Sequence, residues 1–390
     1  MVWKEQYTML KAETAEDVFI DLVRAVLNGE KPSPLPAGIS ADEVYQIGMR
    51  QGMVPIVYCA LSAMDPKPES KNWSKWQQSF LSDCQRSEIQ MEESSRLISF
   101  LCARGVKILP LKGYVIRSLY PSPYLRVMND VDLMYEGIRT EDLAVLMQEA
   151  GYSPESLETG CHDTFHKKPC MKVELHRKLL HDYDPAKGIL QNVFADAEPD
   201  ADIPNLYHIK PEDLYIHVIS HAACHFRSSG IGIRPIADIY LLNHAYNDTW
   251  DRGYIGRQLQ SGRLDRFEAK MRVIAETFFG KEEMNIPKRD ILFLFRGGTY
   301  GKASDVAWKF KGQNRMHFML SIIFPSYAYM HEMFPSQAKH PVLLPFAWIY
   351  RIFDVLLHRR QKIKRIKSTE VNSEKAQYRN EIMADFGLDI

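Results

Sequence analysis

Apolar residues recur at helical spacing through the first hundred positions of the chain. Thr14 precedes the first such segment and is a good helix cap. Ser40 and Glu43 have the spacing of a capping box, which opens another helix. A long stretch that begins at Asn72 keeps the helical period to its end. The pattern predicts a helical region over residues 1–104.

The period changes after residue 105. A short apolar run over 106–109, bounded by turn-forming residues, predicts a buried strand. Lys112 then begins a segment of helical spacing that Pro121 closes. A second predicted strand covers 129–135. The order is strand, glycine turn, helix, loop and strand.

Two further strand-like segments, 160–165 and 171–176, lie on either side of a proline-containing turn. They predict an antiparallel pair. Side chains two positions apart on a strand share a face, so Glu174 lies on the same face as Lys172 and His176.

The last part of the chain returns to helical spacing. Pro211 begins a helix, another is predicted over 236–246, and two more over 253–279. The segment 346–367 predicts an amphipathic helix that becomes strongly basic. A solvated helix end is the simplest interpretation of that tail, and contact with phosphate, an anionic surface or a partner is the alternative.

Composition narrows the class of protein. The chain has 390 residues, a formal net charge of +0 and 45% hydrophobic residues, as ordinary globular proteins do. Zero net charge argues against a nucleic-acid partner, because dedicated binders carry a basic surplus. The charged start of the sequence leads us to expect no export signal, and the sequence has no apolar run long enough to span a membrane. With six irregularly spaced cysteines, these features predict a cytoplasmic protein without a transmembrane segment.

The second predicted strand carries an Asp-x-Asp motif. Asp130 and Asp132 would share one face, roughly 6–7 Å apart at Cα. Two such carboxylates repel each other unless a cation lies between them. Mg²⁺ takes oxygen ligands of this kind and often holds substrate phosphates as well. The layout therefore indicates a site for a nucleotide and a metal ion.

Four motifs together resemble those of the uncharacterised bacterial nucleotidyltransferase family within the DNA polymerase beta-type nucleotidyltransferase superfamily. The likeness covers about residues 40–245. The motifs are Leu111-Lys112-Gly113, Tyr120-Pro121-Ser122-Pro123 with Arg126, Asp130-Val131-Asp132-Leu133, and Val173-Glu174-Leu175-His176.

The resemblance implies an α+β fold, with a small mixed β-sheet nucleotidyltransferase core between two helical regions. We expect an N-terminal helical region over 1–104, the core over 105–205, and a C-terminal helical region with a basic tail over 206–390. If the sheet follows the superfamily's strand order, antiparallel pairing would bring Glu174 beside the strand of the aspartates.

The resemblance also implies an enzyme and its catalytic residues. Asp130 and Asp132 would coordinate Mg²⁺, or Mn²⁺ in its place, bound to a nucleoside triphosphate. Glu174 would be the third carboxylate, holding a second metal ion and helping to activate a hydroxyl of the acceptor. That hydroxyl would attack the α-phosphate in line, and pyrophosphate would leave.

Nucleotide contacts are expected around the glycine turn. Gly113 lets the backbone approach phosphate closely, and Lys112 would place its charge on the β- or γ-phosphate unless it is a solvated helix-start lysine. Tyr114 stands where the superfamily usually has a small residue, so its bulk would crowd the triphosphate. Arg126 would bind phosphate as a fork or neutralise Asp130 or Asp132.

Substrate contacts are expected from residues outside the central motifs. His176 would contact substrate or support a neighbouring ligand, or be an ordinary strand histidine. His221, on one helix face with His225, would contact substrate or pack within the helical region. Arg234 and Asp238 are further candidates for substrate binding, with a structural bridge across one helical turn as the alternative.

A zinc site is the weaker metal hypothesis. Because Cys161 and His162 would face opposite sides of a strand, they would not share an ion. The group considered comprises Cys161, His162, His166 and Cys170.

Two rival functions stay open at this point. A metal-dependent glycosyltransferase also uses Asp-x-Asp, but it needs a nucleotide-binding α/β region upstream, and here the upstream region is predicted to be helical. A catalytically degenerate relative would bind a nucleotide or a partner without turnover. The distance of Glu174 from the two aspartates separates this last case from the enzyme.

Overall fold

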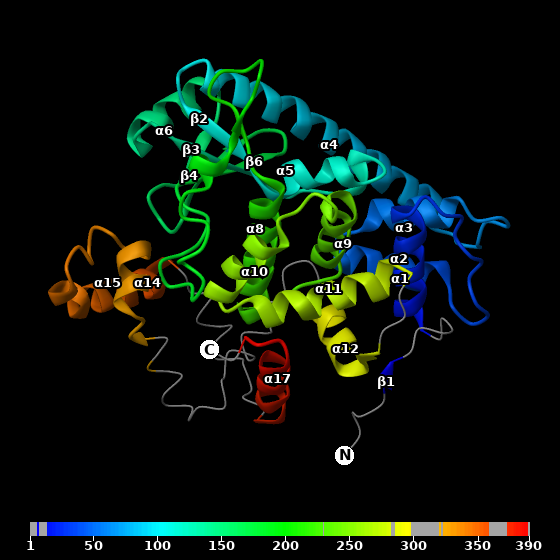
Figure 1. The fold of residues 1–390 in the computed structure, drawn as a ribbon. Helices are drawn as coiled ribbons and strands as arrows, with labels where there is room; N and C mark the ends of the chain where they lie inside the picture. The colour runs from blue at the N-terminus through cyan, green and yellow to red at the C-terminus, as the bar shows by residue number, and fades with distance from the viewer. Residues whose placement is uncertain are drawn as a thin grey trace.

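The structure is a computed structural model that describes residues 6–7, 14–228, 230–281, 285–297, 320, 323–358 and 373–388. Its centre is a five-stranded mixed sheet with strand order β2-β3-β6-β5-β4. The strands are β2 (Lys107–Pro110), β3 (Val131–Glu136), β4 (Ser153–Ser156), β5 (His162–Lys167) and β6 (Met171–His176). Helices precede and follow this sheet, as the α+β prediction requires (Figure 1).

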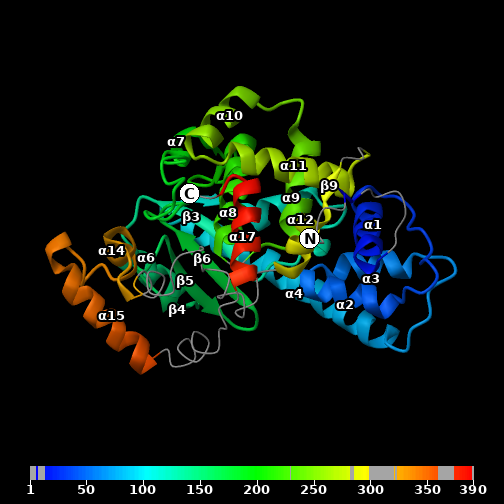
Figure 2. The same cartoon turned by 90° about the horizontal axis from the view of Figure 1, so that it is seen from below.

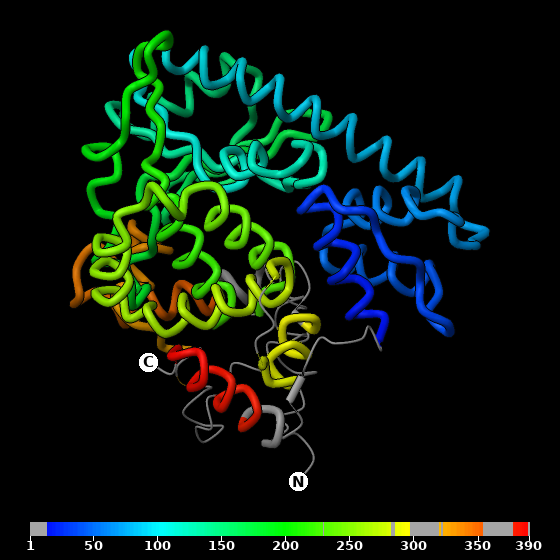
Figure 3. The backbone as a smooth tube through the Cα atoms, turned by 45° about the vertical axis from the view of Figure 1, so that its right-hand side comes forward, coloured from blue at the N-terminus to red at the C-terminus, as the bar shows by residue number. Residues whose placement is uncertain are grey.

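The N-terminal region is helical, as predicted. Ser40 forms the expected capping box with Glu43, and Thr14 caps its helix as expected, through a capping box with Asp17. The long α4 runs from the N-terminal helices across to the sheet (Figures 1 and 3). The four helices are α1 (Ala15–Leu27), α2 (Ala41–Gln51), α3 (Val54–Ser62) and α4 (Trp73–Cys102).

The segment between β2 and β3 departs in part from the prediction. The helix at Lys112 is short, α5 (Lys112–Ile116), and continues as 3₁₀ turns η1 (Arg117–Leu119) and η2 (Pro123–Leu125). Because β3 begins only at Val131, Asp130 lies just before the strand and not within it.

The direction of one strand pair corrects the expected topology. The hairpin of β5 and β6 is antiparallel, as predicted. The pairing of β3 with β6 is parallel, so the antiparallel arrangement expected beside the aspartates is wrong. The chain between them passes through α6 (Thr140–Glu149), β4 and β5, which is the long crossover that parallel neighbours need.

Helices also follow the sheet. They are α8 (Pro211–Ser228), α9 (Arg234–Tyr246), α10 (Arg252–Ser261) and α11 (Asp265–Phe279), which confirms the helical reading of this part. Figure 1 shows α8 and α9 facing the sheet and α5. The large apolar core joins these helices to α1, α2 and α3, and a second cluster fills the space between the sheet, α4 and α6.

Smaller elements complete the described chain. They are β1 (Gln6–Tyr7) paired with β9 (Ile286–Pro287), α7 (Val193–Asp196), β7 (Glu198–Pro199) with β8 (Tyr207–His208), α12 (Lys288–Gly297), α14 (Tyr327–Met333), η4 (Pro341–Leu343), α15 (Leu344–His358) and α17 (Ser373–Asp385). Figure 2 shows α14 and α15 together at one side of the molecule. The basic part of the predicted 346–367 helix lies beyond His358, outside the described residues. No helix in the described part of the chain is long and apolar enough to cross a membrane.

Candidate functional site

Two carboxylates meet at the centre of the sheet. Asp132 on β3 and Glu174 on β6 are register partners across the parallel pair. An oxygen of each and a ring nitrogen of His176 all lie within 4.8 Å of one another. Strand alternation places Glu174 and His176 on one face of β6, as the sequence predicted, and the register of the pair brings Asp132 beside Glu174. These three side chains form a ready set of metal ligands.

Asp130 joins this group from the end of the preceding loop. Its Oδ2 lies 3.5 Å from the ammonium of Lys172, whose Nζ also lies 2.5 Å from Glu174 Oε1. Burial and the neighbouring carboxylates of Asp132 and Glu174 raise the pKa of Asp130. The negative charge of the three carboxylates is therefore only partly neutralised. The ammonium of Lys172 lies between Asp130 and Glu174, where a metal cation would otherwise lie.

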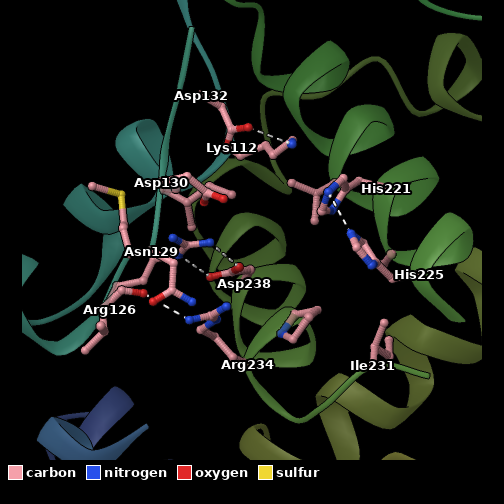
Figure 4. Close-up of a pocket in the computed structure, with 17 residues that line it drawn as sticks. Lys112, Arg126, Asn129, Asp130, Asp132, His221, His225, Ile231, Arg234 and Asp238 are labelled. Atoms are coloured by element: carbon pink, nitrogen blue, oxygen red, sulfur yellow. Dashed lines mark hydrogen bonds and ion pairs between the residues drawn. The ribbon is translucent and has the colours of Figure 1, made fainter. Parts of the chain in front are cut away.

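Lys112 supplies a second ammonium. Its Nζ donates to Asp132 Oδ1 at 3.0 Å (Figure 4). Its φ of 38° is a left-handed conformation that costs a residue with a Cβ on the order of 1 kcal/mol. Although burial acts to lower it, the Asp132 carboxylate holds the pKa of Lys112 above its usual value. The lysine is thus fixed in its charged form over the carboxylates.

The Asp132 carboxylate is held in its ionised form. Burial acts to raise its pKa, but Lys112 and the hydrogen bond with His176 Nε2, at 3.0 Å, lower it well below the usual range. The same hydrogen bond raises the pKa of His176 against the effect of its burial. His176 is thus the hydrogen-bond partner of the Asp132 carboxylate.

Two adjoining cavities open on these side chains. One of about 90 Å³ lies between the Asp130 loop and helices α8 and α9, and the other, of about 300 Å³, lies towards Glu174 and His176. Asp132, His221 and His225 line both. The sheet and the C-terminal helices therefore enclose one common site.

The histidines of α8 face this site as neutral groups. His221 and His225 lie with their Nε2 atoms 3.1 Å apart (Figure 4). Burial, reinforced by the charge of Lys112, lowers the pKa of His221 well below its usual value and that of His225 to about 4. At neutral pH both rings can donate and accept hydrogen bonds without carrying charge.

Arg126 is clamped to α9. Its Nε and Nη2 donate to the two oxygens of Asp238 at 2.8 and 2.7 Å (Figure 4). The hydroxyl of Tyr120 donates to the same carboxylate at 2.8 Å. Two residues of the Tyr-Pro-x-Pro-x-x-Arg motif thus bind one buried acid. The carboxylate that Arg126 pairs with is thus Asp238, because Nε and Nη2 of Arg126 both donate to it. This differs from the expected alternative, in which Arg126 neutralises Asp130 or Asp132.

The structure gives a packing reason for the glycine turn. A Cβ on Gly113 would approach Arg126 Nη1 and the sulfur of Met128 at 3.0 Å or less. Glycine is therefore required here by the position of Arg126 in its pair with Asp238, whether or not phosphate also approaches. Tyr114 turns towards α4, where its hydroxyl lies 3.4 Å from Ser95 Oγ. It is absent from the described lining of both cavities, so it does not crowd them.

Arg234, at the start of α9, also ties the loop to the helices. Its Nη1 donates to the carbonyl oxygen of Val127 at 3.0 Å (Figure 4). It lines the smaller cavity together with Asp238 and His221. The three substrate-binding candidates from the helical region are therefore brought together beside Asp130.

The expectation that strand alternation separates Cys161 from His162 is wrong. Strand β5 begins at His162, so Cys161 precedes it and strand alternation does not separate the two side chains. Cys161 Sγ lies 3.5 Å from His162 Nδ1. His166, in contrast, pairs with Glu155 at the sheet edge. The cysteine and one histidine of the predicted group converge, although with other partners than those considered.

Comparison with known protein families assigns the chain to one of them. Residues 37–280 match the model of a family described as an uncharacterised nucleotidyltransferase, and this match covers more than half of the 390 residues. The chain belongs to this family. The assignment supports a transferase that acts on a nucleotide substrate. The wider polymerase beta-type superfamily and a bacterial origin stay predictions. No curated protein and no solved structure gave a significant match.

Several site residues of this nucleotidyltransferase were not singled out from the sequence. Lys172 was placed on the right face but given no role, and His162 was set aside. A register count from the hairpin turn pairs His162 with His176, so this neighbour was within reach of sequence reasoning. His181 follows β6 in a loop, and only the tertiary fold brings it to the site.

Proposed function

We propose that this chain is a Mg²⁺-dependent nucleotidyltransferase that moves a nucleoside monophosphate from a nucleoside triphosphate to a hydroxyl of an acceptor. The observation that carries the proposal is the Asp132–Glu174 pair on adjacent parallel strands, with Asp130 beside it. Family membership supplies the reaction class. Mn²⁺ is the expected substitute for Mg²⁺.

The residues present fit a hard divalent cation. Asp130, Asp132 and Glu174 offer carboxylate oxygens, the ligands that Mg²⁺ prefers. The raised pKa of Asp130 marks an excess of negative charge at this point, which a cation would relieve. When bound there, the ion would polarise phosphate oxygens and stabilise the charge that develops on them.

The two lysines would change partners when nucleotide enters. Lys112 and Lys172 now neutralise the carboxylates that we assign to the cation. Once those carboxylates are otherwise occupied, each ammonium is free to bind a phosphate oxygen of the triphosphate. Lys112 would contact the β- or γ-phosphate, and the backbone at Gly113 would lie beside it. Arg126 would contribute by holding the loop, with phosphate contact as a further expectation.

The acceptor would enter from the helical side of the site. His221 and His225, neutral at physiological pH, would hold its hydroxyl groups by hydrogen bonds, with Arg234 and Asp238 at the rim of the same cavity. A carboxylate oxygen of Glu174 would take the proton of the attacking hydroxyl. His176 would keep Asp132 ionised and oriented through the hydrogen bond between them.

The geometry favours this enzyme over its two rivals. In a degenerate relative there is no need for Glu174 to approach the aspartates, whereas here it is next to Asp132 and bridged to Asp130 by Lys172. A glycosyltransferase would need a nucleotide-binding α/β region before the motif, and the described chain before β2 is helical apart from the short β1.

Calorimetric titration of ATP, GTP, CTP and UTP tests the proposal. We expect one of them to bind in the presence of Mg²⁺, to lose that binding in EDTA, and to lose it again in Asp130→Ala and Asp132→Ala. Asp142→Ala is the matched control, because that aspartate lies exposed on α6, paired with Arg139. Mg²⁺–nucleotide binding that is unchanged in both site variants would overturn the proposal.

A further inference from the structure

Three histidines surround one buried thiol beside the carboxylates. The side chain of Cys161 is buried, and its Sγ lies 3.5 Å from His162 Nδ1 and 3.6 Å from His181 Nε2. A ring nitrogen of His176 lies within 4.8 Å of the ligand atoms of both Cys161 and His162. In a tetrahedral zinc site with Zn–S of about 2.3 Å and Zn–N of about 2.05 Å, the sulfur and each nitrogen are about 3.6 Å apart. The distances from Cys161 Sγ to His162 Nδ1 and His181 Nε2 already match that geometry.

Each of these histidines has a carboxylate on its other nitrogen. This is the arrangement that fixes the tautomer and orientation of histidines that bind metal ions. The pairs are His162 Nε2 with Glu174 Oε2 at 3.6 Å, His176 Nε2 with Asp132 Oδ1 at 3.0 Å, and His181 Nδ1 with Glu332 Oε1 at 2.6 Å. Three histidines with nearby carboxylates around one sulfur, two of them hydrogen-bonded to their carboxylate, are not explained by packing alone.

The second nitrogen of His176 also indicates a site for a metal ion. The residue is 3% exposed, and its Nδ1 is buried without a hydrogen-bond partner among the described residues. Because Nε2 is used by Asp132, Nδ1 is the nitrogen left to bind a metal ion. A buried polar atom without a partner is costly, and coordination would remove that cost.

We propose that Cys161, His162, His176 and His181 form a second metal site, which takes Zn²⁺. A thiolate with three imidazoles suits Zn²⁺ and not Mg²⁺, which prefers oxygen ligands. Binding would release the thiol proton to solvent. The larger cavity, which these four residues help to line, gives the ion a path of entry.

The site joins parts of the chain that are distant in sequence. Cys161 and His162 stand at the start of β5, His176 ends β6, and Glu332 belongs to α14. Glu332 also accepts a hydrogen bond from the backbone N–H of Asp182 at 2.8 Å. A bound ion would fasten α14 to the sheet and, through His176, fix the orientation of Asp132. Its role is therefore structural and positioning, and it does not depend on the proposed nucleotidyl transfer.

Cobalt substitution tests the site directly. The full-length protein, freed of metal and without nucleotide, is titrated with Co²⁺ and followed by absorption. We expect one equivalent to give a thiolate-to-cobalt charge-transfer band with the strong visible bands of tetrahedral Co²⁺, and Zn²⁺ to displace it. Cys161→Ser should lose the charge-transfer band, whereas Cys170→Ser, in the turn of the same hairpin, should keep it. A wild-type protein without the band, or a Cys161→Ser variant that retains it, would overturn the proposal.

Glu332→Gln gives a second test that leaves all four ligands in place. Loss of the carboxylate behind His181 should weaken Co²⁺ binding about 10- to 100-fold. Glu155→Gln is its control, because that carboxylate holds His166, at 2.6 Å, outside the site. Equal Co²⁺ affinities in the two variants would show that the Glu332 carboxylate does not support His181 as a metal ligand. Asp130→Ala should keep the cobalt bands even where it abolishes nucleotide binding, so the two proposals can fail separately.

Discussion

Asp132 and Glu174 lie side by side on parallel strands, and each has a lysine ammonium on its carboxylate: Lys112 on Asp132 and Lys172 on Glu174. The ammonium of Lys112 helps to keep the buried Asp132 carboxylate ionised without a metal ion. It also means that a cation entering the site must displace positive charge already there. The nucleotide's phosphates then become the natural partners of the displaced ammonium groups.

Removing either carboxylate should abolish turnover. Asp132→Asn and Glu174→Gln keep the shape of the side chain but lose its charge, so we expect a fall in rate of about a thousandfold, roughly 4 kcal/mol of transition-state stabilisation. Pyrophosphate release measures it. Glu136→Gln, at the exposed end of β3 and paired with Lys107, is the control and should stay near wild type. A site variant as active as this control would refute the assignment.

Lys172→Met should bind divalent cations more tightly in the absence of nucleotide. The change removes a charge that competes for Glu174 and Asp130, and we expect Mn²⁺ affinity to rise about tenfold. Titration followed by electron paramagnetic resonance gives the value. Lys107→Met, whose ammonium lies on Glu136 and away from the site, should leave the affinity unchanged. Weaker binding in Lys172→Met would show that the lysine does not occupy a cation's place.

Asp238→Asn should destabilise the protein strongly. It removes the carboxylate that pairs with the buried guanidinium of Arg126, and breaking such a pair costs about 3–5 kcal/mol of unfolding free energy. Denaturant unfolding measures the change. The exposed pair of Arg139 and Asp142 provides the contrast, because Asp142→Asn should cost under about 1 kcal/mol. Equal effects of the two substitutions would argue that the clamp contributes little.

These residues also show what the sequence could predict. Alternation along β6 placed Glu174 with Lys172 and His176, and the capping signals placed α1 and α2, because both rest on neighbours along the chain. The clamp between Arg126 and Asp238 was not predicted, since it joins residues far apart in sequence. The parallel direction of β6 beside β3 was not predicted either, because it depends on the path of the chain between the two strands.

Stability should fall below about pH 6.5, in part because of His217. Burial on α8, reinforced by the charge of Lys112, lowers its pKa well below the usual value. The unfolded chain therefore binds a proton that the folded protein excludes, so the unfolding free energy decreases as pH falls through the unfolded pKa of about 6.5. When the pH falls from about 6.5 to 5, the unfolding free energy of the His217→Leu variant should decrease by about 1.5 kcal/mol less than that of the wild type. Identical losses in denaturant unfolding would contradict this origin.

The most direct test of the central claim is anomalous diffraction from crystals grown with Mn²⁺ and a non-hydrolysable nucleoside triphosphate. We expect anomalous density between the carboxylates of Asp132 and Glu174, within reach of Asp130. We also expect the ammonium of Lys112 to have moved from Asp132 to a phosphate oxygen. Nucleotide bound elsewhere, or manganese absent from these carboxylates while nucleotide is present, would contradict it.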